Sequence, residues 1–541
     1  MPRTNTLPPY TAALSLSVAW LVAALMVGFE GNFPLNDDWQ YAYPVKQWVE
    51  VGQLSIQARF SPNILTQVAW GALFCKLGGG FSFECLRWSA WVAAGLGGLG
   101  FFRLLRLLGV SVSMATVGTA VLLFSPLYFH LSFSFMTDVP FLALVIWAAW
   151  AGLRFQQSRH VQWLLIFTVL SLLAYLNRQP GILLFPAMGG WYLLQQRGGM
   201  RGWLWAGLSV AVAAGAYLLL ENTVKPWLGI SENYLPVSGQ LLQQLREAPG
   251  GVLAQLGRQS FKSWVYLGAF CLPLLPFLWS RVRAAGVLRL WPLTGILVAN
   301  GGLLIAQHYA GHVFPYGGNI LYNWGLGPEL LGDVYTFQLP NTPRLPIWMM
   351  YGLGYISQLS ASLLTWVGLS AWRELNHKQQ DFFLFLLLLN LANFLAMSVT
   401  GFFDRYMLLS VASAILFLAT LAPKPQAWFK GAVLLIFALF SMLATHDYLA
   451  CNRARAQAFQ WLQRNDIRMQ RVDAGYEYNG WHHYHPERKG QPGKSWWWVD
   501  DDEWMIAFGP RPGYAMQAGF TYQRWLWGGR PDRVWVLRRE P

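Results

Sequence analysis

Residues 11–29, TAALSLSVAWLVAALMVGF, are followed within seven positions by the stretch Asn36-Asp37-Asp38-Trp39-Gln40-Tyr41-Ala42-Tyr43. The first segment has no charged residue and is long enough to cross ~30 Å of hydrocarbon as a helix. The second segment therefore begins at a membrane surface and places two adjacent carboxylates there. Ionisable side chains in or beside a bilayer are costly and are functional-site hypotheses by default. We therefore expect a membrane protein with an acidic site just outside its first span.

The composition supports this interpretation along most of the chain. Of the 541 residues, 55% are hydrophobic and only 12% are charged, whereas soluble domains carry about 25% charged residues. Apolar runs recur from Thr11 to Thr445. The sequence predicts an all-α polytopic membrane protein with long outer loops and a small α+β C-terminal extracytoplasmic domain.

Thirteen apolar segments are the predicted transmembrane helices. Their approximate bounds are 11–29, 87–108, 113–132, 139–154, 162–177, 181–196, 203–220, 262–280, 286–306, 346–370, 381–401, 405–421 and 430–445. An odd number of spans places the two termini on opposite sides of the membrane.

Basic residues set the predicted orientation, because short cytoplasmic loops are enriched in Lys and Arg. With a cytoplasmic N-terminus, every inner loop is short and basic. These loops contain Arg103, Arg106, Arg154, Arg159, Arg197, Arg201, Arg281, Arg283, Arg289, Arg373, Lys378, Lys424 and Lys430. The net charge of +14 is therefore a topology signal, and we expect no nucleic-acid partner.

Acidic residues are sorted in the opposite sense. Of the fourteen Asp and Glu residues before position 446, only Glu374 and Asp381 fall on the inner side. The other twelve lie at or beyond the outer face, so we expect the chemistry on that side.

The predicted domains are a transmembrane domain, 1–445, and a soluble extracytoplasmic domain, 446–541. The first outer loop, 30–86, carries the acidic motif and two expected interfacial helices, Val45–Val51 and Ser61–Phe74. Two further outer loops cover Glu221–Phe261 and Gln307–Leu345. In the soluble domain we expect a helix over Arg453–Asn465 and strands over Met469–Asp473 and Arg533–Leu537.

The Asp37-Asp38 pair is the leading catalytic candidate. Transfer of a group to a hydroxyl needs a base that accepts the hydroxyl proton, and a carboxylate can be that base. Adjacent carboxylates repel each other, which favours proton uptake by one of them. The alternative is a solvated pair that caps a helix beginning at Trp39.

Three more outer turns carry charged candidates. Asp138 precedes Val139-Pro140 at the start of an apolar segment, where it could also be a helix N-cap. Arg178 and Arg405 begin two other turns. They could extend toward the lipid interface, or bind a lipid phosphate with their planar guanidinium groups.

Three motifs in this order resemble those of the clan C glycosyltransferases, in particular the protein O-mannosyltransferases and the aminoarabinose transferases of lipid A. They are Asp37-Asp38-x-x-Tyr41-Ala42, the Phe-x-Thr-Asp-x-Pro pattern of Phe135–Pro140, and Asp404-Arg405-Tyr406. The resemblance covers residues 1–420. It differs at Asp38, where these relatives often have Glu, and no counterpart of their Glu-Lys-Pro-Pro segment is found. Arg59, beside Phe60-Ser61-Pro62-Asn63, is a basic substitute.

The resemblance implies a donor sugar linked to a polyprenyl phosphate, an acceptor that is a glycan, lipid or protein, and inversion at the anomeric carbon. It makes Asp37 the expected general base, with Asp38 and Asp138 beside it. The expected ligands of the lipid phosphate are Arg405, Arg178 and Arg59, together with Tyr41 and Tyr406. It also implies a bacterial inner membrane.

Several alternatives stay open. The chain could be a glycolipid flippase or transporter, which would require ionisable groups near the membrane centre and inverted repeats, or a polysaccharide ligase or polymerase. No cofactor is expected with certainty; a divalent metal is possible, although neither His482-His483-Tyr484-His485 nor Asp500-Asp501-Asp502-Glu503 has a usual ligand spacing. Cys75 and Cys85 are either bridged or free thiols.

Overall fold

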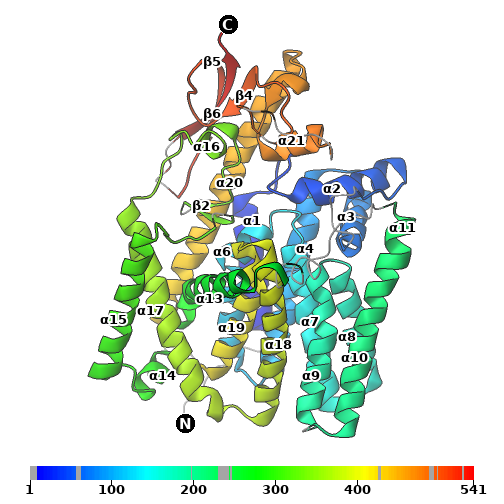
Figure 1. Ribbon diagram of the computed structural model, residues 1–541, viewed down its shortest axis with the longest axis vertical. Helices are drawn as coiled ribbons and strands as arrows, with labels where there is room; N and C mark the ends of the chain where they lie inside the picture. Colours follow the sequence, from blue (N-terminus) through cyan, green and yellow to red (C-terminus); the bar gives the residue numbers. More distant parts are fainter. Residues whose placement is uncertain are drawn as a thin grey trace.

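The computed structural model is predominantly helical, and its long helices lie below a small sheet (Figure 1). It describes residues 9–56, 63–196, 198–229, 243, 246–317, 319–323, 325–423, 428–485, 491, 493–495, 497–526, 529 and 531–541. Buried apolar side chains of the long helices and of the sheet form one continuous cluster. The helical part and the sheet therefore share a core.

Each of the thirteen predicted apolar segments overlaps a helix. These helices are α1 (Pro9–Val27), α4 (Phe83–Leu107), α5 (Val112–Leu123) with α6 (Pro126–Leu131), α7 (Asp138–Ser158), α8 (Val161–Tyr175), α9 (Leu184–Gln195), α10 (Met200–Leu219), α13 (Pro249–Cys271), α15 (Leu290–Tyr309), α17 (Ile347–Ala371), α18 (His377–Thr400), α19 (Leu408–Leu421) and α20 (Ala432–Arg464). Among the described residues, seven helical segments are long and apolar enough to cross a membrane. The chain is thus an integral membrane protein, and the count of thirteen spans stays a prediction.

Short elements connect the long helices. They are α2 (Asp38–Lys46), η1 (Gln47–Val51), α3 (Leu65–Leu77), η2 (Gln179–Leu183), η3 (Leu220–Val224), α11 (Lys225–Trp227), η4 (Leu272–Leu274), α14 (Trp279–Ala284), β1 (Leu321–Tyr322), β2 (Gly325–Leu326), α16 (Gly332–Tyr335), η5 (Trp372–Glu374), η6 (Asp404–Met407), η7 (Trp428–Gly431) and η8 (Met469–Arg471). In the first outer loop, α2 with η1 and α3 correspond to the two expected interfacial helices. Cys75 and Cys85 are free thiols in the structure.

The long helices differ in how much of their apolar surface the protein covers. In α7, 78% of the most apolar window is buried, against 6% in Met200–Trp227. A helix that is apolar all round and buried belongs to a core, whereas α10 leaves its apolar side chains for lipid. The N-terminal end of α7, where Asp138 lies, is therefore inside the protein.

Two glycines let α4 approach α7 closely. A Cβ built on Gly97 would lie 2.5 Å from the Tyr128 hydroxyl and 3.1 Å from the Cβ of Ala143. A Cβ on Gly100 would lie 2.9 Å from the ring of Trp147. Small residues at such contacts are the usual means of close helix packing in membranes, and this packing fixes the position of α7.

Arg87 of α4 holds the segment that leads from α1 to the acidic stretch. Its side chain is fully buried and donates to the carbonyl oxygens of Phe29 at 3.1 Å, of Phe33 at 2.5 Å, and of Gly31. The guanidinium carbon also lies 4.2 Å from the centre of the Phe33 ring. One buried cation thus replaces the backbone partners that this irregular segment lacks.

The C-terminal region forms a four-stranded sheet with strand order β3-β4-β6-β5. The strands are β3 (Val472–Asp473), β4 (Trp504–Ala507), β5 (Tyr514–Gln523) and β6 (Pro531–Arg539), and α21 (Tyr476–His483) follows β3. β3 and β4 are parallel, and the other pairs are antiparallel. The expected strand over Arg533–Leu537 lies within β6. The other expected strand, Met469–Asp473, is shorter than predicted. Only Val472–Asp473 is a strand, because Met469–Arg471 forms a 3-10 turn.

One unbroken helix joins the membrane part to the sheet. α20 has 33 residues, and it contains both the last predicted span and the helix expected over Arg453–Asn465. The predicted domain boundary at residue 446 falls inside it. There the Asp447 carboxylate accepts hydrogen bonds from the backbone amides of Trp525 at 2.6 Å and Leu526 at 3.1 Å, which ties the helix to the loop after β5.

Candidate active site

Asp37 lies at the turn into α2, directly after a residue with left-handed backbone. Asn36 has φ +51°, a conformation that Asn adopts more readily than most residues. Asp37 occupies the N-cap position of α2, yet its side chain makes no capping hydrogen bond. The Asp37 carboxylate therefore does not cap the helix, and its oxygens bind other partners.

Two partners hold the Asp37 carboxylate. Oδ2 lies 2.7 Å from Nη1 of Arg405, and Oδ1 accepts a hydrogen bond of 2.7 Å from the hydroxyl of Tyr476. Arg405, in η6, is buried, and the Asp37 side chain is 20% exposed. The ion pair thus sits at the edge of the protein interior with part of its carboxylate open to an incoming group.

A second acid–arginine pair lies beside the first. Arg178, which precedes η2, makes an ion pair with Asp138 at the start of α7. Asp138 is not the N-cap of α7, since Thr137 holds that position. The carboxylate is nevertheless favourably placed, because the first turn of a helix attracts negative charge.

Two tyrosines join the pairs into one cluster. The guanidinium carbons of Arg178 and Arg405 lie 5.1 Å and 5.5 Å from the centre of the Tyr406 ring. Tyr41 of α2 lies within electrostatic range of both acids and both arginines, and burial raises its pKa. The four charged groups sum to zero in a partly buried site, which is the condition under which buried charges are tolerated.

We use the name acid–arginine cluster for Asp37, Asp138, Arg178, Arg405, Tyr41 and Tyr406. The sequence prediction named all of these residues, and the structure brings them together from four separate turns that are predicted to lie on the outer side. Arg59, the remaining predicted phosphate ligand, lies outside the described residues.

Asp38 has a different environment from its neighbour. It is almost fully buried, and its carboxylate accepts hydrogen bonds from the backbone amides of Leu35 at 2.7 Å and Phe135 at 3.4 Å. Burial raises its pKa from 3.8 to about 7, against the opposing effect of these hydrogen bonds and of the Arg87 charge. Asp38 thus joins the first outer loop to the turn before α7, and its contacts are those of a residue that positions Asp37 and Asp138.

Asp38 also makes the stability depend on pH. Because the pKa of Asp38 is raised in the folded state, the folded protein keeps a proton on Asp38 that the unfolded chain has lost. The free energy of unfolding therefore decreases as the pH rises from about 4 to about 7. We expect the thermal unfolding midpoint of Asp38→Asn in nanodiscs to change less between pH 5 and pH 8 than that of the wild type. Equal slopes for the two proteins would contradict this environment for Asp38.

Asp404 clamps the third outer loop. Its carboxylate accepts from the backbone amide of Ile320 at 3.0 Å and from that of Leu321 at 2.6 Å. The side chain is fully buried. Asp404 therefore fixes β1 against the turn that carries Arg405 and Tyr406, and its role in the three-residue motif is to hold its neighbours in place.

The sequence prediction missed the residues that the C-terminal region adds. Tyr476 is 439 positions from Asp37 in the sequence. A third ion pair, fully buried, joins Arg455 of α20 to Glu477 of α21 at 2.8 Å, and Glu477 also accepts from the backbone amide of Asn36 at 3.4 Å. Tyr476 and Glu477 thus contact the turn that holds Asp37, and Arg455 holds Glu477 in place. α20 and α21 therefore support the acid–arginine cluster from the side of the sheet.

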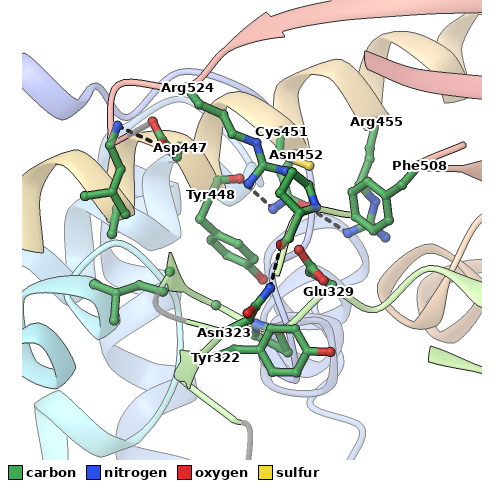
Figure 2. A pocket seen from close by; sticks show the side chains of 17 residues that line it. Tyr322, Asn323, Glu329, Asp447, Tyr448, Cys451, Asn452, Arg455, Phe508 and Arg524 are labelled. Carbon is green, nitrogen blue, oxygen red and sulfur yellow. Dashed lines mark hydrogen bonds between the residues drawn. The ribbon is translucent and has the colours of Figure 1, made fainter. Parts of the chain in front are cut away.

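A separate cavity lies between the β1–β2 hairpin, α20 and the sheet (Figure 2). Its volume is about 60 Å³, and its wall includes Glu329, Tyr448, Arg455 and Arg524. No residue of the acid–arginine cluster lines it. The cavity is large enough for water, since about 10–15 Å³ of accessible space holds one molecule.

The two candidate metal motifs have other partners. His482 stacks on Phe459 with ring centres 4.9 Å apart, and burial lowers its pKa to about 4. In the acidic run, Asp502 pairs with Arg511 at 3.3 Å and also with Arg539. Across the described part of the chain, no group of three or more His, Cys, Asp or Glu side chains is placed to hold a metal ion.

Part of the chain matches a known family. Residues 68–227 match the family model described as dolichyl-phosphate-mannose-protein mannosyltransferase. The matched segment contains Asp138 and Arg178, and it ends before Arg405. The match confirms the resemblance to clan C membrane glycosyltransferases that the motifs predict.

Solved structures of low sequence identity align along most of the chain. ArnT from Cupriavidus metallidurans in the apo state is 15% identical, with 97% of this chain and 98% of that chain covered and a TM-score of 0.39. The same protein bound to undecaprenyl phosphate gives 14% identity, coverage of 98% and 97%, and a TM-score of 0.35.

The oligosaccharyltransferase AglB from Archaeoglobus fulgidus, in complex with an inhibitory peptide and a dolichol-phosphate, is 14% identical. The alignment covers 90% of this chain and 62% of that chain, with a TM-score of 0.40. No curated protein sequence matches this chain. All three TM-scores lie below 0.5, so these alignments carry no functional assignment for this chain.

Proposed function

We propose that the protein transfers a sugar from a polyprenyl-phosphate carrier to a hydroxyl of a glycan, lipid or protein acceptor at the extracytoplasmic face of a bacterial inner membrane. The N-terminus is then cytoplasmic and the sheet is extracytoplasmic. The observation that carries this proposal is the acid–arginine cluster, in which a partly open carboxylate lies beside two guanidinium groups at the end of buried membrane helices.

Asp37 is the base in this reaction. It takes the proton of the acceptor hydroxyl as the hydroxyl oxygen attacks the anomeric carbon. The bond between that carbon and the phosphate oxygen breaks, and its electron pair leaves with the polyprenyl phosphate. Attack from the face opposite the phosphate inverts the configuration at the anomeric carbon.

Arg405 and Arg178 bind the phosphate. A guanidinium has five N–H donors, so a single carboxylate partner leaves donors for phosphate oxygens. Nε of Arg405 is buried and has no hydrogen-bond partner among the described residues. An unpaired buried donor is costly, and a phosphate oxygen would satisfy it. Asp138 then keeps Arg178 in place while the phosphate gains charge during departure.

The direct test is a transfer assay with the purified protein in nanodiscs. The assay supplies polyprenyl-phosphate-linked sugars of several kinds with membrane glycolipids or peptides as acceptors, and mass spectrometry detects the product and its anomeric configuration. We expect a new glycosidic bond and free polyprenyl phosphate. Movement of the lipid between leaflets without any new bond would contradict the proposal and favour a flippase.

Arg178→Lys tests the phosphate site. Lysine keeps a positive charge beside Asp138 but lacks the planar set of donors that matches a phosphate. We expect the KM for the lipid donor to rise roughly 10-fold, with a smaller change in kcat, because the contact acts before and during transfer. Initial rates over a range of donor concentrations measure both.

Arg281→Lys is the matched control, because Arg281 also pairs with a single carboxylate, that of Glu374, at the predicted cytoplasmic side. It should leave the KM unchanged. An equal rise in KM for both variants would show that Arg178 acts through stability alone.

A further inference from the structure

The C-terminal region places one hydroxyl against the proposed base. The hydroxyl of Tyr476 is 2.7 Å from Oδ1 of Asp37, and Nε2 of Gln40 is 2.8 Å from the same hydroxyl. The amide nitrogen of Gln40 can only donate, so the tyrosine oxygen accepts from it. The tyrosine hydroxyl therefore donates its proton to Asp37. In this chain of hydrogen bonds Gln40 donates to Tyr476, and Tyr476 donates to Asp37.

The ring of Tyr476 is held on several sides. It contacts the rings of Trp39, Trp497 and Trp498, with centres 5.7–6.0 Å apart. The backbone amide of Tyr476 donates to the carbonyl oxygen of Leu330 at 3.0 Å. The position of the hydroxyl is therefore set by the packing of α21 and by the third outer loop.

We infer that Tyr476 is a positioning residue for the transfer reaction, an assignment that rests on the proposed role of Asp37. Arg405 holds one carboxylate oxygen and Tyr476 holds the other, so the plane of the carboxylate is fixed. Each oxygen accepts more than one hydrogen bond, which leaves room for the acceptor hydroxyl. Docking of α21 thus completes the catalytic geometry on the membrane domain.

Loss of this hydroxyl has two expected effects on the reaction. The carboxylate gains rotational freedom, which lowers the fraction in productive geometry. It also loses a donor that favours the ionised form. The other charged or titratable members of the acid–arginine cluster are Arg405, Tyr41, Tyr406, Asp138 and Arg178, and the substitution leaves all five in place.

Tyr476→Phe is therefore expected to lower kcat roughly 10- to 100-fold and to move the acid limb of the pH–rate profile to higher pH. The KM for the lipid donor should stay within about twofold, since the described hydrogen bonds of the Tyr476 hydroxyl go to Gln40 and Asp37 and to neither arginine. The measurement is the initial rate of transfer in nanodiscs from pH 5 to pH 9.

Tyr478→Phe is the matched control on the same helix. The Tyr478 hydroxyl is buried and has no hydrogen-bond partner among the described residues, so its removal should leave the rate and the pH profile unchanged. Gln40→Leu gives a second test that does not alter the aromatic packing. It removes the group that directs the tyrosine proton, and it should shift the profile in the same direction by a smaller amount.

A wild-type kcat and pH profile in both Tyr476→Phe and Gln40→Leu would overturn the positioning role, even if Asp37→Asn is inactive. Transfer that persists in Asp37→Asn would instead overturn the proposed base, and with it the role of Tyr476. Thermal unfolding of the single variants and of the Asp37→Asn, Tyr476→Phe double variant checks the contact itself: coupled residues give non-additive changes in stability.

Discussion

Transfer by the Asp37→Asn variant is expected to fall by about 10²–10⁴-fold, the usual contribution of a general base. Asparagine has almost the same shape, and its amide oxygen can still accept from Arg405 or Tyr476. It cannot take up the proton of an acceptor hydroxyl at neutral pH. Initial rates in nanodiscs, with the unfolding midpoint measured on the same preparation, separate lost catalysis from lost folding.

Asp38→Asn is the neighbouring control for this result. Among the described residues, the hydrogen bonds to Asp38 come from backbone amides, so its replacement should lower transfer less than Asp37→Asn does and should also lower the unfolding midpoint. Asp37→Glu keeps the carboxylate but moves it by about one bond, and it should retain a small part of the activity. Normal transfer by Asp37→Asn would remove Asp37 as the base, and loss of activity in parallel with the unfolding midpoint would assign it a structural role.

The largest expected effect on stability belongs to Arg455→Met. The Arg455 and Glu477 side chains are 2% and 0% exposed and lie 2.8 Å apart. Removing one partner of a buried ion pair leaves an uncompensated charge, at a cost of roughly 3–5 kcal/mol. We expect a lower unfolding midpoint and reduced transfer, because Glu477 also contacts the backbone of Asn36. Thermal unfolding in nanodiscs and the transfer assay measure the two effects.

Arg453→Met is the matched control two residues earlier on α20. Arg453 pairs with Glu30, which is 78% exposed, and surface pairs contribute about 0–1 kcal/mol. Adding Glu477→Leu to Arg455→Met should restore part of the stability, since replacing both members of a buried pair by apolar residues is often neutral. Equal destabilisation by Arg453→Met and Arg455→Met would contradict the burial of the Arg455–Glu477 pair.

The sequence was sufficient to predict the helical class and the place of the long helices. Burial in a bilayer requires continuous apolar segments whose backbone hydrogen bonds are satisfied internally. Each such segment can therefore be recognised from its own stretch of sequence. It does not distinguish a helix that faces lipid from one inside the protein. The apolar segments of α7 and α10 look alike in sequence, and only packing separates them.

The C-terminal region was harder to predict. Tyr514–Gln523 pairs along its whole length with β6, yet it contains no regular apolar alternation and lies in a region rich in Gly, Pro and Trp. The last predicted span and the predicted helix over Arg453–Asn465 form one helix, although charge density rises at Asp447 and Arg453. A change in composition marks where a helix leaves the lipid, and it does not require the helix to end.

Three acidic residues with similar sequence contexts have three different environments. Asp37 pairs with Arg405 and Tyr476, Asp38 accepts backbone amides of two segments, and Asp404 holds β1. All three stand at outer turns, so the sequence alone could not separate them. Tyr476 could not be found at all from the sequence, because no local pattern indicates which residue reaches a partner 439 positions away.

The unbroken course of α20 has a mechanical consequence. At about 1.5 Å per residue, its 33 residues form a rod of about 50 Å, and Asp447 anchors the sheet part-way along it. Because the backbone hydrogen bonds of the helix run without a break from the last predicted span to Arg464, no flexible linker separates the sheet from the membrane helices. The spacing between the membrane part and the sheet is thus set by helix geometry.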